Sequence, residues 1–332
     1  MSRRRAPVLV VGATGQLGSQ VVLKLAERGE RVRALVRQGS RQAHLQVRGV
    51  ELVVGDLRDA ASIDAACRGA RAVVATASSV VPRGDETFEA VEGLGYAELI
   101  GACRRHGHAH VVLISVPVTP VDDQVPLFHW KRQIERRLQA SGLPTTVFRA
   151  GPFMDDWLVF IGSRLPMRGD PAALALRPWD FMQRFLGVVG GLVERRGLAL
   201  IPGSTRVRHA FISVDDTAEY LVRAVLGQPP RGFEVLDIAG PQSLSWTEVA
   251  AVMSQVLGRP VRAVGTPSFV YRATQRAMRP FSEAASNIMG LNWVAGRHAM
   301  VSDGAAAARR YGVRPTSLEQ FLRAKASLPA EA

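Results

Sequence analysis

The stretch Val8–Gly18, which reads VLVVGATGQLG, decides the fold. Its first four residues form a continuous apolar run, which is typical of a strand buried on both faces of a parallel sheet. Apolar residues then recur at helical spacing within Ser19–Arg28, and this predicts a helix there. A strand, a glycine-rich turn and a helix in this order are the start of a dinucleotide-binding βαβ unit.

The three glycines of this turn have separate expected roles. Gly12 permits the tight turn, Gly15 lets the backbone approach a pyrophosphate, and Gly18 lets the helix pack close to the sheet. The N–H groups and partial positive charge at the helix N-terminus also favour phosphate. The alternative is a glycine turn without a ligand. The predicted cofactor-binding residues of the turn are Gly12, Thr14, Gly15, Gln16, Leu17 and Gly18.

Strand and helix patterns keep alternating up to residue 150. The predicted strands are Arg31–Val36, Glu51–Val54, Ala72–Ala75, His110–Ser115 and Thr145–Phe148. The predicted helices among them are Ala60–Cys67, Phe88–Arg105 and Lys131–Ala140. Because parallel strands need crossover connections, this alternation predicts an α/β fold with a Rossmann-type, doubly wound parallel sheet.

The pattern changes after residue 150. Further helices are predicted at Trp179–Arg195, Thr217–Leu226 (behind a capping box, Ser213–Asp216), Ser245–Leu257, Pro267–Met278 and Ser317–Ala326. Short strands are predicted at Ala210–Ile212 and Phe233–Ile238. We therefore expect an NAD(P)-binding domain over residues 1–160, completed by 207–240. A smaller, discontinuous C-terminal substrate lobe would comprise 161–206 and 241–332.

The end of the second strand selects the cofactor. NAD-binding sites usually place Asp or Glu there to bind the ribose 2′-hydroxyl. Here Val36 is followed by Arg37-Gln38-Gly39-Ser40-Arg41, without a carboxylate. Arg37 can pair with a 2′-phosphate, with Ser40 or Arg41 assisting, which favours NADP(H) over NAD(H). The alternative is that Arg37 is one more arginine in an arginine-rich chain.

Composition sets the remaining limits. The chain has 332 residues, 47% hydrophobic and 21% charged, which is typical of a globular protein with about two lobes. We expect no transmembrane segment, because no apolar run reaches the ~18–20 residues that a span needs. Two cysteines exclude a disulfide framework, and no export cleavage pattern follows the N-terminal Met1–Arg5. A cytoplasmic location is expected.

The net charge of +13 raises nucleic acid as a partner. However, 39 of the 42 basic residues are Arg, and Arg3–Arg5 is the only run of three. Scattered arginine indicates a compositional bias rather than a binding stripe, so nucleic acid is not expected as a partner.

Beyond the glycine turn, several stretches carry a family resemblance. They are Gly55-Asp56-Leu57, Val112-Leu113-Ile114-Ser115, Lys131–Glu135, Ser141–Thr146, Arg149–Phe153 and His209–Ala218. With these, the chain resembles the atypical short-chain dehydrogenase/reductases of the NmrA-like group over about residues 7–160 and 207–258. That group includes reductases as well as assembly or regulatory factors.

The resemblance implies roles for individual residues. Asp56 and Leu57 would flank the adenine of the cofactor. Thr76, Ala77 and Ser78 would follow the ribose and nicotinamide, and Pro152 and Phe153 would lie beside the nicotinamide face. Ser115 matches the serine that contacts the reacting carbonyl. One feature departs from the classical pattern: Leu127 stands four residues before Lys131, where Tyr-x-x-x-Lys has its proton-donating tyrosine.

Lys131 is the strongest candidate for proton chemistry. It is one of three lysines, and Lys supplies what Arg does not, a compact ammonium whose pKa falls when it is desolvated. Three interpretations stay open: a general acid or base, a ligand of the ribose hydroxyls, or a surface lysine. His129 has similar alternatives, a pocket residue or a polar residue at a helix start.

Other patterns carry weaker indications. Phe153, Met154 and Trp157 are expected to line a pocket for an apolar substrate, or else to form lobe core. The next helix, with Phe181, Phe185 and Val189, is expected to contribute to the same pocket or core. Phe185–Val193 could instead dock on a partner or a membrane surface, but its glycines favour a packed lid. His106, His108 and His110 alternate along an extended segment, but we expect no metal site. Cys67 and Cys103 are expected in the core.

We therefore expect an NADPH-dependent reductase with a small, apolar acceptor of the carbonyl, enone or quinone class. The alternative is a catalytically silent NADP(H)-binding redox sensor or assembly factor. A nucleic-acid-associated regulator has only the charge in its favour. The partner is expected to be a small molecule, and the protein a monomer or a homodimer.

Overall fold

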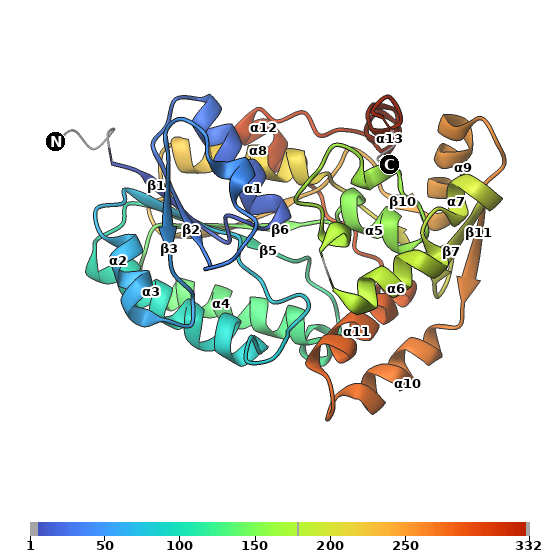
Figure 1. The fold of residues 1–332 in the computed structure, drawn as a ribbon, viewed down its shortest axis with the longest axis horizontal. Coiled ribbons are helices and arrows are strands. Elements are labelled where there is room, and N and C mark those ends of the chain that lie inside the picture. Colours follow the sequence, from blue (N-terminus) through green and yellow to red (C-terminus); the bar gives the residue numbers. More distant parts are fainter. Residues whose placement is uncertain (1–5, 178, 330–332) are drawn as a thin grey trace.

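The structure, a computed structural model, describes residues 6–177 and 179–329 (Figure 1). The basic run Arg3–Arg5 and the side chain of Phe181 lie outside what is described. Within the described residues, seven parallel strands form the main sheet in the order β3-β2-β1-β4-β5-β6-β9. Their bounds are β1 Val8–Val11, β2 Val32–Val36, β3 Val50–Val54, β4 Ala72–Ala75, β5 Val111–Ser115, β6 Thr145–Ala150 and β9 Phe233–Ile238. The predicted Rossmann-type sheet is confirmed.

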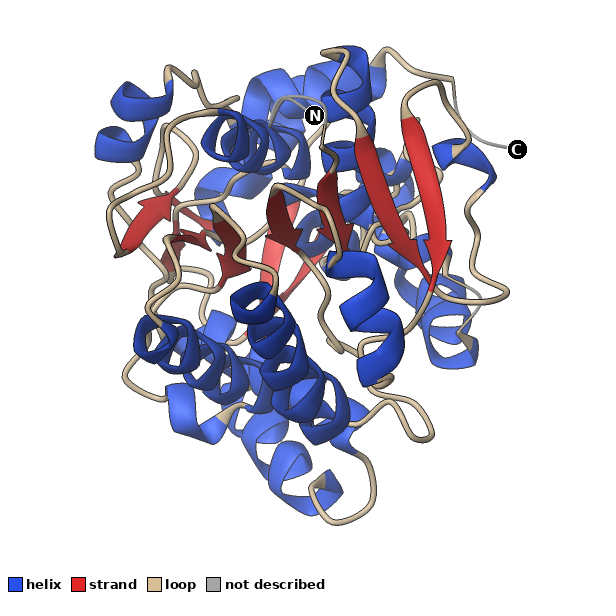
Figure 2. Ribbon diagram, turned by 90° about the vertical axis from the view of Figure 1, so that its left-hand side faces the viewer, coloured by secondary structure: helices blue, strands red, loops and turns tan. Residues whose placement is uncertain are grey.

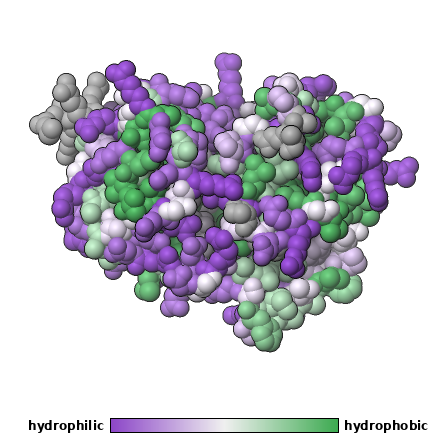
Figure 3. Space-filling view, viewed as in Figure 1, coloured by the Kyte–Doolittle hydropathy of each residue, from purple (hydrophilic) through white to green (hydrophobic). Residues whose placement is uncertain are grey.

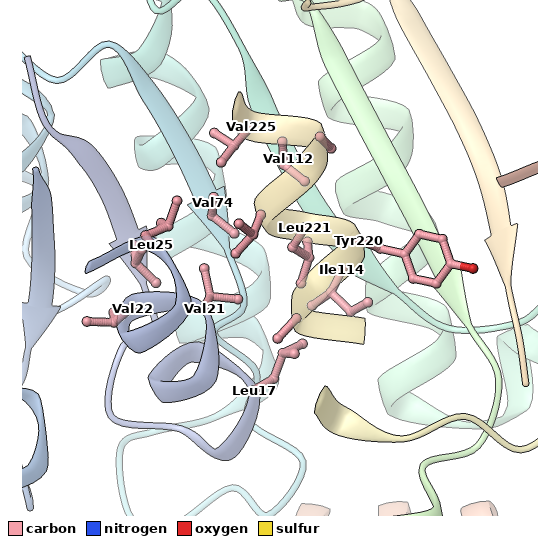
Figure 4. Packing of buried hydrophobic residues seen from close by; sticks show 14 of the residues in the cluster. Leu17, Val21, Val22, Leu25, Val74, Val112, Ile114, Tyr220, Leu221 and Val225 are labelled. Carbon is pink, nitrogen blue, oxygen red and sulfur yellow. The ribbon is translucent and has the colours of Figure 1, made fainter. Parts of the chain in front are cut away.

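Helices cover both faces of this sheet (Figure 2). On one face lie α1 (Gln16–Glu27), α8 (Val214–Leu226) and α12 (Ala305–Tyr311); on the other lie α2 (Ala60–Cys67), α3 (Tyr96–Arg105) and α4 (Pro126–Ser141). Figure 4 shows the first layer, where Leu17, Val21 and Leu25 of α1 meet Leu221 and Val225 of α8 over the apolar strands. Burying both sheet faces explains why the central strands β1, β4 and β5 read as nearly continuous apolar runs.

The remaining elements lie together beside the sheet, on the right of Figure 1. They are α5 (Met154–Phe160), α6 (Asp180–Val189), α7 (Leu192–Arg196), β7 (Leu198–Pro202), β10 (Leu244–Ser245), α9 (Trp246–Leu257), β11 (Arg262–Thr266), α10 (Ser268–Met278), α11 (Glu283–Arg297) and α13 (Leu318–Ala326). β7 pairs in parallel with β11, and β8 (Arg208–His209) pairs antiparallel with β10. Whether they form a separate domain stays a prediction. None of the described helices is both long and apolar enough for a membrane span.

Several predicted elements differ in detail. The helix predicted at Phe88–Arg105 begins with a π-helical segment, Glu89–Gly95, before α3. The one predicted at Trp179–Arg195 is broken into α6 and α7, because Gly191 takes the left-handed conformation (φ +81°).

Two further expectations were partly wrong. Residues 210–212 form no strand within the described chain; Ile212 makes a single bridge to Phe153. The Ser213 hydroxyl caps α8 by accepting from the N–H of Asp216. The Asp216 carboxylate does not complete the box, because it accepts from the N–H of Thr316 at 2.8 Å instead.

Candidate functional site

A cavity of about 410 Å³ lies at the carboxyl ends of strands β1 to β6. This is where open α/β sheets bind ligands. The predicted site residues that line it are Gly12, Thr14, Gly15, Gln16, Leu17, Gly18, Arg37, Asp56, Leu57, Thr76, Ala77, Ser78, Ser115, Lys131, Pro152, Phe153 and Trp157. The prediction for Met154 differs from the structure: Met154 is 1% exposed and packs against Phe211 and Leu158 in the core beneath.

The glycine turn has the shape that a pyrophosphate needs. Gly12 has φ +86°, and a Cβ there would lie 2.5 Å from the Ala77 backbone nitrogen. A Cβ on Gly18 would lie 2.1 Å from the Gly12 carbonyl oxygen, whereas at Gly15 the nearest atom would be 3.1 Å away. The first amides of α1 point into this turn without an intrahelical acceptor, and no described side chain caps them. The turn therefore fits a dinucleotide phosphate.

Arginines surround the end of the cavity that is formed by the loops after β2, β3 and β4. Arg37 forms an ion pair with Glu86, while Arg58 pairs with Asp56 at 2.8 Å and with Asp85 at 2.7 Å. The hydrogen bond from Arg58 lowers the pKa of Asp56, so this carboxylate stays ionised. These pairs join the loops that follow β2, β3 and β4. Arg37 is thus held at the cavity wall rather than free in solvent.

A segment from beyond the sheet, residues 170–177, lies across the glycine turn. Arg177 donates from Nη2 to the Thr14 carbonyl oxygen at 2.7 Å, and Gln16 donates from Nε2 to Asp170 at 2.8 Å. Burial and the nearby charges of Arg37, Arg41 and Arg83 lower the pKa of Arg177. No sequence pattern pointed to Arg177, because its position depends on how the stretch with Gly162, Pro166, Gly169 and Pro171 folds back. Crowded guanidinium groups beside a phosphate turn favour a polyanionic ligand.

Ser115 lies in the cavity wall, but its hydroxyl is already engaged. Its Oγ donates to Glu135 Oε1 at 2.5 Å, and Arg149 donates to the other carboxylate oxygen at 2.6 Å. Burial acts to raise the pKa of Glu135, but the hydrogen bond from Arg149 and the charge of Arg132 outweigh it and leave the pKa below its usual value. An ionised carboxylate only accepts hydrogen bonds. Ser115 therefore has no proton left to donate to a substrate carbonyl, in contrast to the role that the resemblance implies.

Lys131 is 3% exposed, so the interpretation as a surface lysine is wrong. Its Nζ lies 3.5 Å from the Ala77 carbonyl oxygen and 5.6 Å from the Tyr96 ring centre. Burial lowers the pKa of Lys131, and the charges of Glu92 and Glu135 partly oppose this. An ammonium group thus faces the cavity between the glycine turn and the apolar end.

Glu92 is the buried counter-charge of Lys131 and was missed in the sequence. It is 0% exposed and lies on the π-helical segment, a distortion often found at functional sites. Its Oε1 accepts from Ser78 Oγ at 3.0 Å and from the Ser79 N–H at 2.6 Å, while Oε2 has no partner among the described residues. Burial raises the pKa of Glu92, and the charge of Lys131 opposes this.

Asp156 faces the apolar end of the cavity and was also missed. It lines the cavity with Phe153, Trp157 and Phe160, and its carboxyl group has no hydrogen-bond or ion-pair partner among the described residues. Burial, together with the charges of Asp155 and Asp170, raises the pKa of Asp156 to about 8. A carboxyl group in such an environment is protonated at neutral pH and can donate a hydrogen bond.

His106, His108 and His110 each contact a different partner. His108 Nδ1 lies 3.2 Å from the Cys103 carbonyl oxygen, whereas His110 contacts Thr146 at 2.9 Å and His106 contacts Asp64 at 3.1 Å. In the described part of the chain, no group of three His, Cys, Asp or Glu side chains is placed to hold a metal ion. His129 lies 3.4 Å from Asp123, outside the cavity lining. Both cysteines are buried, as predicted.

Comparison with known proteins agrees with this geometry. The model of the NmrA-like family matches residues 5–322, nearly the whole chain. The chain belongs to the NmrA-like family.

Two relatives in this family show different activities. The NAD(P)H azoreductase of Xenophilus azovorans is 30% identical over 257 residues, which is 77% of this chain and 76% of that protein. Photosystem II assembly factor Ycf39 of Synechocystis sp. is 24% identical over 327 residues, 95% of this chain and 89% of that protein.

A solved structure shares the fold. The NADPH-dependent quinone oxidoreductase QOR2 of Escherichia coli, complexed with NADPH, matches with a TM-score of 0.69 and 19% identity, over 95% of this chain and 98% of that chain. The family match extends past the segments 7–160 and 207–258, in which the motifs lie, and includes most of the elements beside the sheet.

Proposed function

We propose that this NmrA-like protein is an NADPH-dependent reductase that transfers hydride to a small, largely apolar acceptor of the carbonyl, enone or quinone class. One observation carries the proposal: a single cavity joins the phosphate-shaped glycine turn to an apolar end, and Lys131 and Asp156, two groups able to supply a proton, line it. The azoreductase relative supports the reaction class.

The residues present fit NADPH better than NADH. Gly12, Gly15 and Gly18 shape the turn for the pyrophosphate, and the first amides of α1 face it. Arg37, with Arg177 nearby, supplies positive charge for a 2′-phosphate, and residues 37–49, between β2 and β3, contain no Asp or Glu. When bound, NADPH supplies the hydride. Thr76, Ala77 and Pro152 form the walls along which the ribose and nicotinamide would lie.

Lys131 and Asp156 have different roles in this proposal. The Lys131 ammonium is held by the Ala77 carbonyl and the charge of Glu92, which suits a group that binds ribose hydroxyls and keeps the nicotinamide end positive. The Asp156 carboxyl group faces the apolar end and carries a proton at neutral pH. We assign Asp156 as the proton donor. It protonates the atom of the acceptor that becomes negatively charged when the hydride is added.

The test is a binding titration followed by turnover. NADPH and NADH are titrated against the purified protein by nucleotide fluorescence, and NADPH oxidation is then followed with menadione and with 2-cyclohexenone. We expect NADPH to bind at least tenfold more tightly than NADH, and turnover with at least one acceptor. Absent binding of both nucleotides would refute the proposal.

The second candidate is a silent NADP(H)-binding assembly factor. The near full-length match to Ycf39 and the missing tyrosine of Tyr-x-x-x-Lys favour it. Tight NADPH binding without turnover of any quinone, enone or azo dye would support this candidate over the reductase. A cytoplasmic location and a monomeric or homodimeric state stay predictions.

A further inference from the structure

Helix α10 and the turn after it present an apolar face to the outside. Phe269 and Phe281 are 72% and 82% exposed, and Val270 is 47% exposed. Ala273 and Ala277 are exposed on the same side of the helix. Figure 3 shows green and pale residues at the lower edge of the molecule, where Figure 1 places α10. Single exposed apolar residues are ordinary, but a contiguous row with two phenylalanines indicates an interaction site.

Positive charge borders this face. Arg276 and Arg279 are exposed, and neither has an ion-pair partner among the described residues. Residues 249–302 contain six arginines but a single acidic residue, Glu283. The Glu283 carboxylate is directed inward, where it accepts from the Phe88 N–H at 3.1 Å. The surface around α10 is therefore positive as well as apolar.

The face is held rigidly in place. α10 packs along α11, and Gln275 on its inner side donates to the Gln124 carbonyl oxygen at 2.6 Å. A Cβ on Gly290 of α11 would lie 2.7 Å from the Gln275 amide nitrogen, so the two helices approach closely. On its other side α11 contributes Ile288 and Leu291 to the cavity wall. The exposed face and the cavity are thus separated by one helix.

We propose that this protein docks peripherally on an anionic lipid bilayer through the α10 face, which comprises Phe269, Val270, Ala273, Ala277 and Phe281 with Arg276 and Arg279. A helix with large apolar residues beside arginines and no acidic residue has the composition of an interfacial membrane helix. Each arginine near an anionic surface strengthens binding about fivefold. Two other partners fit this face less well. In a dimer formed through it, the arginines of the two copies would repel each other. A polyanion without apolar groups would leave both phenylalanines in water. The proposal does not depend on the reductase function.

The experiment measures binding to sonicated vesicles by flotation. The full-length protein is mixed with pure phosphatidylcholine vesicles, or with vesicles containing 30% phosphatidylglycerol. We expect binding to the anionic vesicles, little binding to the neutral ones, and weakening by salt. Phe269→Ser/Phe281→Ser and Arg276→Glu/Arg279→Glu should each weaken binding at least tenfold.

Matched controls separate this face from general surface charge. Arg309→Glu/Arg314→Glu makes the same charge change at exposed sites in and just after α12, on the opposite side of the molecule in Figure 1. Val188→Ser removes another exposed apolar side chain, 76% exposed. Both controls should bind within about twofold of the parent, and all variants should keep its thermal midpoint. Absent binding to anionic vesicles, or equal loss with the α12 control, would overturn the proposal. So would a dimer in sedimentation velocity that Phe269→Ser/Phe281→Ser dissociates.

Discussion

Replacing Asp156 by Asn should stabilise the protein and impair its turnover. The carboxyl group lines the cavity without a cation or donor among the described residues, and its neighbours Asp155 and Asp170 carry the same sign of charge. Asn has nearly the same shape but does not titrate. Functional groups in such unfavourable surroundings reduce stability in exchange for activity.

The magnitude follows from the pKa of Asp156, which is raised from 3.8 to about 8. The folded protein then holds a proton that the unfolded chain releases, so stability decreases by about 1.4 kcal/mol per pH unit between these two values. At pH 7 this amounts to about 4 kcal/mol, and water in the cavity reduces it to about 2–4 kcal/mol. Asp156→Asn should therefore raise the free energy of unfolding by that amount at pH 7, and by very little near pH 4.

The assay is urea unfolding at pH 4, 5, 6, 7 and 8 for both proteins, with menadione-dependent NADPH oxidation over the same range. The difference in stability should grow with pH and level off near pH 8, and the activity of the parent should decline through the same region. Asp123→Asn, at a carboxyl group that is 83% exposed, serves as the control. A pH-independent stability difference, or full turnover of Asp156→Asn above pH 7, would refute the reasoning.

Five other substitutions test the remaining parts of the site. Lys131→Met and Glu92→Gln should each cost about 3 kcal/mol in urea unfolding, because each leaves a buried charge alone, whereas the double variant should cost less than their sum; additive losses would contradict the pairing. Arg37→Ala should weaken NADPH binding about 10- to 100-fold in fluorescence titration and NADH binding less than threefold; equal losses would contradict contact with a 2′-phosphate. Gly18→Ala should abolish binding of both nucleotides, because its Cβ would lie 2.1 Å from a carbonyl oxygen; retained affinity would show that the turn holds no phosphate. Ser115→Ala should cost about 1–2 kcal/mol of stability yet keep most turnover; a hundredfold loss in kcat would restore its implied catalytic role.

The first half of the fold was predictable from local sequence because its signals are local. Val8–Val11 is apolar at every position since both of its faces are buried, and Gly12 is fixed by its own backbone conformation. Phe233–Ile238 was predicted as a strand as well and pairs with β6, although it contains Glu234 and Asp237 and is only partly buried. Helix α4 begins earlier than expected, at Pro126, because its first turn is tied to a distant helix through the bond from the Leu127 N–H to Asn287.

The site was predictable only where it follows strand ends. Arg37 and Asp56 come directly after β2 and β3, so the topology places them at the cavity. Arg177 and Asp156 belong to the segments after β6, and their positions depend on the packing of α5 and of residues 170–177. The raised pKa of Asp156 depends partly on the charge of Asp170, which is distant in sequence, and periodicity carries no information about it.

The arginine content shows how composition can mislead. A net charge of +13 first points to nucleic acid, but much of the arginine is balanced locally, as in the pairs of Arg58 with Asp56 and of Arg28 with Glu219 at 2.7 Å. Two places combine unbalanced arginine with a surface able to bind a ligand, namely the surroundings of Arg177 beside the glycine turn and residues 249–302. A small polyanion fits the first, because the guanidinium groups lie in a cavity. An extended anionic lipid surface fits the second, because its arginines border exposed phenylalanines that a bilayer interface would bury.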